Sequence, residues 1–109
     1  MAENADHRKL AAILCADVKG YSKLMGEDES YTVRALKECR QLFAESIQIH
    51  GGRVVNAPGD SILAEFPSIV SAVQCAVEIQ NQLKSRNTEL PDNRKMVFRI
   101  GVNLGDVIQ

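Results

Sequence analysis

The chain has 109 residues, with 13 Lys and Arg against 14 Asp and Glu, and a formal net charge of −1. That length suits one domain rather than two. An apolar content of 45% with a charged content of 25% is typical of a soluble globular protein. The near-neutral charge argues against binding to nucleic acid or to an anionic membrane surface, because both need a basic excess.

The sequence carries no sign of export or of a membrane segment. Residues 1–9 are polar and are expected to form a tail, so they do not resemble a secretory signal. No apolar run approaches the roughly 20 residues that span a bilayer. Cys15, Cys39 and Cys75 are widely spaced and form no Cys-x-x-Cys motif, which favours reduced thiols in a cytoplasmic protein over disulfides or a zinc site.

The first expected element is a strand over residues 10–16. This stretch is continuously apolar, which is typical of a central strand covered on both faces. Asp17 ends it, and Gly20 lies just beyond. A helical segment then runs from about residue 22 to residue 50, with an interruption near residues 26–30 and an end at Gly51-Gly52. The side chains expected on its core face are Val33, Leu36, Arg40, Phe43 and Ile47.

A hairpin and a second helix are expected next. Residues 53–56 and 61–66 form the strands of the hairpin, and the turn between them contains Pro58, Gly59 and Asp60. The second helix covers residues 69–86, with Ser68 as a suitable N-cap. A polar loop leads to an alternating strand over residues 98–104, on which Arg99 is expected to be an ordinary surface residue. The side chains expected on the core face of the second helix are Ile69, Ala72, Val73, Ala76, Ile79 and Leu83.

This order of elements predicts an α+β fold of the ferredoxin-like βαββαβ type. Right-handed crossovers give an antiparallel sheet with strand order 4-1-3-2 and helices on one face. The first strand then ends at Asp17 on the same edge as the hairpin turn that holds Asp60. Two acids 43 positions apart in the sequence are therefore expected to be neighbours.

Two carboxylates at one sheet edge suit divalent cations. Mg²⁺ prefers oxygen ligands and binds one or two carboxylates together with substrate phosphates. Gly20 and the helix start after it offer backbone amides to phosphate groups. Each acid also has an ordinary structural explanation, since Asp often caps a helix and Gly-Asp often forms a turn. The residues alone leave both interpretations open.

Four stretches together resemble class III adenylate/guanylate cyclases, particularly the bacterial group. The resemblance extends over residues 8–109. It implies that residues 10–109 belong to a catalytic domain and stop before its C-terminal part. The four stretches are residues 10–22, 50–55, 59–66 and 98–107.

The resemblance implies a site and a reaction. Asp17, Asp60 and the Val18 carbonyl would bind two divalent ions, Mg²⁺ or Mn²⁺. A nucleoside triphosphate, ATP or GTP, would be converted to a 3′,5′-cyclic nucleotide and pyrophosphate for signal transduction, in a homodimer of the complete domain. The amides implied to contact the phosphates are those of Gly20, Tyr21 and Ser22.

Two departures from the family pattern affect the expected activity. Asn56 stands where adenylate cyclases usually have a base-reading Lys and guanylate cyclases often have Glu, and its amide can both donate and accept. The later segment of the family domain, with further base-reading and transition-state residues, is not in this chain. The 109-residue piece alone is therefore expected to be inactive, and a degenerate nucleotide-binding or dimerisation module with a regulatory role remains an alternative. A diguanylate cyclase is disfavoured, because the turn reads Pro58-Gly59-Asp60-Ser61 rather than Gly-Gly-Asp/Glu-Glu-Phe.

Overall fold

The computed structural model describes residues 8–108, and the side chains of residues 10–105. Most of the expected polar tail over residues 1–9 therefore lies outside the described residues, as does Gln109. The first half of the chain contains β1 (Arg8–Val18), α1 (Tyr21–Glu27), α2 (Glu29–Ile49) and β2 (Arg53–Asn56). The second half contains β3 (Ile62–Phe66), α3 (Ile69–Asn87), a short 3₁₀ helix (Asp92–Arg94) and β4 (Phe98–Ile108).

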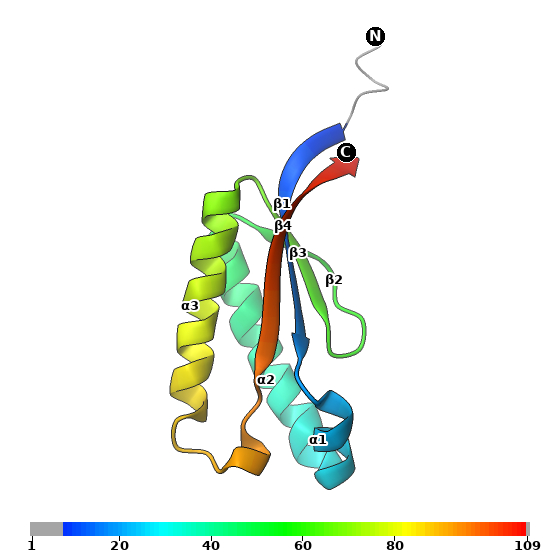
Figure 1. Ribbon diagram of the computed structural model, residues 1–109, viewed down its shortest axis with the longest axis vertical. Coiled ribbons are helices and arrows are strands. Elements are labelled where there is room, and N and C mark those ends of the chain that lie inside the picture. Colours follow the sequence, from blue (N-terminus) through cyan, green and yellow to red (C-terminus); the bar gives the residue numbers. More distant parts are fainter. Residues whose placement is uncertain (1–7, 109) are drawn as a thin grey trace.

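The strands form one antiparallel sheet within the described residues, in the order β2-β3-β1-β4. This is the expected 4-1-3-2 order read from the other edge, so the α+β ferredoxin-like prediction is confirmed. Helices α2 and α3 pack side by side on one face of the sheet, and α1 lies below the end of β1 (Figure 1). No helix within residues 8–108 lies on the opposite face of the sheet. The fold therefore has two layers, with its core between the helices and the sheet.

Local sequence signals explain where the helices begin and why a glycine follows α2. Asp28 interrupts the first helical segment and caps α2, because its side chain accepts a hydrogen bond from the Tyr31 amide at 3.0 Å. Ser68 caps α3 in the same way. Gly52 follows α2 where a Cβ atom would lie 2.6 Å from the Phe66 ring, so only glycine fits there.

The core prediction is correct for most positions and wrong for a few. Leu36, Phe43 and Ile47 of α2 are buried, as are Ala72, Ile79 and Leu83 of α3. Val33, Ile69 and Val73 are exposed instead, because these helices turn Cys39 and Cys75 toward the sheet. Cys39 lies three residues after Leu36 and four before Phe43, so it continues the buried stripe of α2 at helical spacing. Cys75 does the same between Ala72 and Ile79 of α3. In the core, the rings of Phe43 and Phe98 lie 4.8 Å apart between their centroids.

The expectation that the first strand is covered on both faces is wrong. Leu14 and Ala16 of β1 are buried under the helices, whereas Cys15 between them is exposed on the other face. Side chains alternate along a strand, so the uncovered face receives every second residue of β1. No described helix is both long enough and apolar enough to cross a membrane.

Candidate functional site

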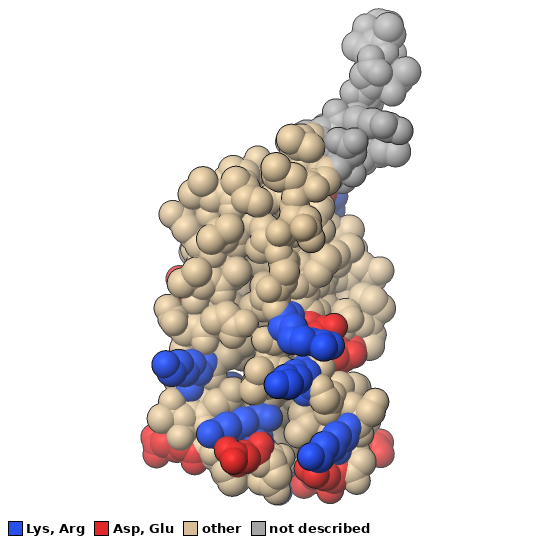
Figure 2. Space-filling model, in the orientation of Figure 1, with Lys and Arg blue, Asp and Glu red and all other residues tan. Residues whose placement is uncertain are grey.

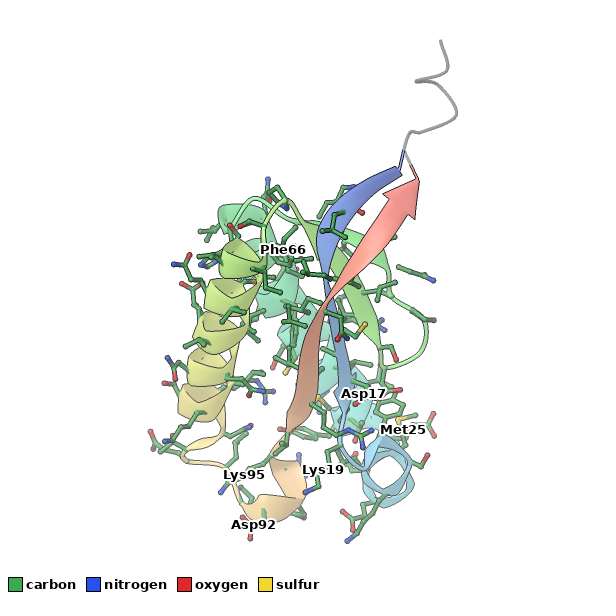
Figure 3. All side chains as sticks on the ribbon, turned by 45° about the horizontal axis from the view of Figure 1, so that its top comes forward. Asp17, Lys19, Met25, Phe66, Asp92 and Lys95 are labelled. Carbon is green, nitrogen blue, oxygen red and sulfur yellow. The ribbon has the colours of Figure 1, made fainter. Side chains whose placement is uncertain are left out.

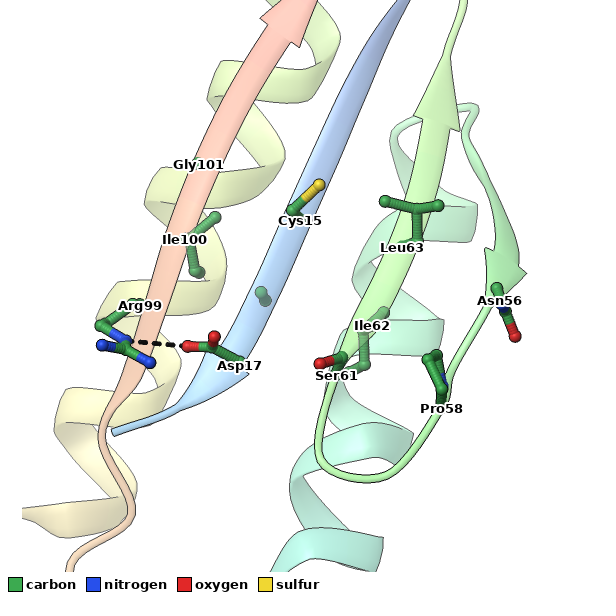
Figure 4. Close-up of a pocket in the computed structure, with 11 residues that line it drawn as sticks. Cys15, Asp17, Asn56, Pro58, Ser61, Ile62, Leu63, Arg99, Ile100 and Gly101 are labelled. Carbon is green, nitrogen blue, oxygen red and sulfur yellow. Dashed lines mark hydrogen bonds and ion pairs between the residues drawn. The ribbon is translucent and has the colours of Figure 1, made fainter. Parts of the chain in front are cut away.

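The end of β1 brings Asp17 against Arg99. The two residues are direct partners in the antiparallel register of β1 and β4, and both face the uncovered side of the sheet. The Arg99 Nε atom donates a hydrogen bond to Asp17 Oδ1 at 2.8 Å (Figure 4). This hydrogen bond and the charge of Asp17 raise the pKa of Arg99, and the charge of Asp60 adds to the effect. Arg99 is exposed on the outward face of its strand, as expected, and the expectation did not include its ion pair with Asp17.

The β2–β3 turn brings Asp60 to the same edge. The Ser61 amide donates to the Pro58 carbonyl at 2.8 Å and closes a tight turn, with Gly59 at a φ of 57°. Strand β3 pairs with β1 only up to Ala16, so the backbone amide of Val18 has no strand partner on that side. Asp60 Oδ2 accepts a hydrogen bond from this amide at 3.0 Å. The Asp60 side chain thus takes the place of the missing strand partner. The turn geometry confirms that Asp17 and Asp60 lie at one edge of the sheet.

A hollow of about 570 Å³ lies on the uncovered face beside these residues. Its floor includes Cys15, Leu63 and Gly101, and its rim includes Asp17, Arg99 and Asn56 (Figure 4). This volume is in the range of small-molecule sites. The Asn56 side chain is exposed, and its Oδ1 atom accepts a hydrogen bond from the Ala57 amide at 2.9 Å. In the described chain, Asp60 lies beside this hollow and does not line it.

The chain turns sharply between β1 and α1. Gly20 has a φ of 67° and stands at the N-cap of α1, and a Cβ atom placed there would meet no neighbour. The first amides of a helix lack partners within the helix, and those at this end belong to Tyr21 and Ser22. Tyr21 packs partly against the core, whereas Ser22 is exposed. The three residues expected to contact phosphates therefore follow Asp17 at the same end of the sheet.

Charged side chains gather at this end of the molecule. Figure 2 shows lysines, arginines and acids around the lower part of the visible face, whereas the upper part over α3 and β4 carries almost none. Asp17, Lys19, Asp92 and Lys95 all lie toward this lower end (Figure 3). The mixture of signs gives local pairs, such as Lys95 with Asp92 at 3.2 Å, rather than a field of one sign.

Comparisons with known proteins agree with the fold and with the sequence stretches. No family model matches the chain. A curated protein of Rhizobium meliloti (strain 1021), named "Putative adenylate cyclase 3", is 44% identical over 109 residues, which are 99% of this chain and 19% of that protein. The chain thus spans about a fifth of the length of that relative.

Solved structures of cyclases also match the chain. The crystal structure of an adenylate/guanylate cyclase/hydrolase from Silicibacter pomeroyi matches with a TM-score of 0.83 and 39% identity, over 91% of this chain and 58% of that one. The guanylyl cyclase Cya2 matches with a TM-score of 0.78 and 27% identity, over 91% of this chain and 55% of that one. With fold and sequence in agreement, the chain belongs to the class III adenylate/guanylate cyclase family.

Proposed function

We propose that the complete protein converts a nucleoside triphosphate, most favourably ATP, to a 3′,5′-cyclic nucleotide and pyrophosphate in signal transduction. The observation that carries the proposal is the placement of Asp17 and Asp60 at the same end of the sheet, where Asp60 Oδ2 accepts a hydrogen bond from the amide of Val18, the residue after Asp17. The preference for ATP is supported by the 44% identity to a relative whose name is adenylate cyclase. The whole protein would act as a homodimer in the cytoplasm.

The donors at this edge fit Mg²⁺ or Mn²⁺. Asp17 and Asp60 offer carboxylate oxygens, and the Val18 carbonyl belongs to the same corner of the chain. Among the described residues, no group of three or more His, Cys, Asp or Glu side chains could hold a metal ion by itself. Two carboxylates completed by water and by substrate phosphates are a typical environment for Mg²⁺. Two bound cations would supply activation of the attacking hydroxyl and neutralisation of the triphosphate charge.

The residues of this chain would bind and orient the substrate. Asp17 and Asp60 would hold the cations, and the amides of Gly20, Tyr21 and Ser22 would contact phosphate oxygens at the turn after β1. The hollow beside them would take the base or the ribose, with Asn56 at its rim.

The positive charge of Arg99 neutralises the negative charge of Asp17 before any ligand binds. The Arg99 guanidinium donates a hydrogen bond to Asp17 Oδ1, so a metal ion that binds this oxygen must share or displace that contact. A displaced guanidinium would remain at the edge of the same hollow, and its planar set of donors suits phosphate oxygens. Arg99 would therefore compensate Asp17 in the empty site and the triphosphate in the loaded one.

The test uses Asp17→Asn and Asp60→Asn variants of the complete protein. Calorimetric titration with Mn²⁺ and ATP or GTP should show binding weakened by about 100-fold, because each variant removes a charged ligand. Cyclic nucleotide formation, followed by chromatography, should fall at least as far. Asp92→Asn is a matched control, because Asp92 is an exposed acid at the same end of the molecule.

Three outcomes would contradict the proposal. Unchanged titrations in both site variants would remove the assignment of Asp17 and Asp60. Nucleotide binding without any cyclic product, under Mg²⁺ and under Mn²⁺, would instead indicate a degenerate regulatory module. A dinucleotide product would indicate diguanylate cyclase chemistry.

A further inference from the structure

We propose that Arg40 is a positioning residue that fixes the β2–β3 turn and thereby aims the Asp60 carboxylate. The inference rests on the proposed function, because it concerns the geometry of one proposed cation ligand. Arg40 lies in the middle of α2, on the side that faces the sheet, and its residue is half-buried. Its guanidinium reaches the turn of the hairpin.

One atom of Arg40 contacts the turn on both sides of Asp60. Its Nη2 atom donates to the Ala57 carbonyl at 3.1 Å and to the Ser61 carbonyl at 3.4 Å, and it also donates to the Gly59 carbonyl. Carbonyls of alternate residues thus converge on a single cationic group. Their partial negative charges would repel one another without a cation between them, so Arg40 stabilises this particular shape of the turn.

Strand pairing alone constrains the turn of this hairpin weakly. Strand β2 is the outer strand of the described sheet, and each of its four residues is exposed. The pairing of β2 with β3 shifts register between Val54 and Asn56, directly before the turn. A short edge strand with an irregularity constrains a turn weakly. The contact from α2 supplies the constraint that strand pairing lacks.

The position of the turn determines where the Asp60 carboxylate points. Asp60 Oδ2 reaches the Val18 amide at 3.0 Å, and Val18 follows Asp17 directly. A turn released from Arg40 would move Asp60 relative to Asp17 without touching either side chain. Ligand sites tolerate displacements of only about 0.5 Å, so such a release should weaken cation binding.

The experiment compares Arg40→Met with Arg53→Met in the complete protein. Met keeps much of the length of the side chain and removes the donors. Arg53 is the matched control, because its Nε atom donates to Glu65 Oε1 at 2.6 Å within the same hairpin but away from the turn. Two quantities are measured: the hydrogen–deuterium exchange rate of the Val18 amide without metal, and the affinity for Mn²⁺ alone. The midpoint of thermal unfolding is recorded for each variant.

Arg40→Met should speed exchange of the Val18 amide and weaken Mn²⁺ binding by about tenfold, as the loss of a residue that supports a ligand typically does. Arg53→Met should change neither quantity, even if its unfolding midpoint falls as far. Arg40→Lys keeps a cation and should show smaller changes in Val18 exchange and in Mn²⁺ affinity than Arg40→Met. It serves as the test variant if Arg40→Met does not fold. Normal exchange and normal Mn²⁺ affinity in the Arg40 variants would overturn the proposal, as would equal effects in Arg53→Met.

The outcome also separates this inference from the proposed function. If Asp60→Asn leaves Mn²⁺ binding unchanged, the proposed function fails. The exchange rate of the Val18 amide still decides whether Arg40 holds the turn, because that readout involves no metal.

Discussion

The two faces of the sheet differ although they are built from the same strands. On the covered face, β1 and β3 present Leu14, Ala64 and Phe66, which are buried under α2 and α3. On the uncovered face, β1 presents Cys15 and Asp17, with much of their surface accessible. The covered face accounts for stability, and the uncovered face places polar groups at one end around a hollow. Stability and the candidate site are thus divided between the two faces of one sheet.

The largest expected contrast concerns the cysteines. Burial raises the pKa of the Cys39 thiol and of the Cys75 thiol, so both stay protonated and unreactive. Cys15 is exposed on the uncovered face. Iodoacetamide under native conditions should label Cys15, and the buried thiols should react at least about a thousandfold more slowly because they need an opening of the fold. Peptide mapping by mass spectrometry measures the three rates, and similar rates would mean that the two faces are equally accessible.

A pair of truncations compares the faces in terms of stability. Phe43→Ala removes a fully buried ring and should lower the free energy of unfolding by about 3–5 kcal/mol. Leu63→Ala on the uncovered face should lower it by about 1 kcal/mol or less. Urea denaturation of both variants provides the measurement. A larger loss for Leu63→Ala than for Phe43→Ala would show that the uncovered face is itself packed against something.

The smallest effect is expected for Arg99→Met. The midpoint of unfolding should stay unchanged, because an exposed ion pair contributes little to stability. Binding of Mn²⁺ alone should become tighter by roughly threefold, because a cation that competes for Asp17 is removed. Calorimetry with Mn²⁺ gives the affinity, and Arg86→Met, which breaks the ion pair with Glu38 away from the site, is the control. Weaker Mn²⁺ binding in Arg99→Met would mean that Arg99 orients Asp17 rather than competing for it.

The sequence predicted the order of elements, the strand order and the shared edge of Asp17 and Asp60. Strong signals carried these predictions: an apolar run before Asp17, paired glycines after α2 and a proline-glycine turn before Asp60. The helix faces were predicted only in part: Cys39 and Cys75 lie at the helical spacing of the buried side chains, whereas Val33 and Val73 lie at the border of that stripe and are exposed.

The contacts between distant residues could not be predicted. Arg99 meets Asp17 because of the register between β1 and β4, and a register across a long crossover leaves no local signal. Arg40 was predicted to share the apolar face of its helix, but nothing in its neighbours indicates that a turn 17 to 21 positions later would be its partner.

The unequal lengths of the strands have a consequence for how the molecule loosens. β1 and β4 pair along 11 residues each, whereas β3 pairs with β1 only over residues 12–16. Residues 8–11 therefore form a two-stranded ribbon with residues 105–108, and this ribbon projects beyond the helices (Figure 1). An isolated pair of strands is marginally stable. Fraying should thus begin at the ribbon tip, at the far end of the strands from Asp17, so that early thermal loosening leaves the carboxylate edge intact.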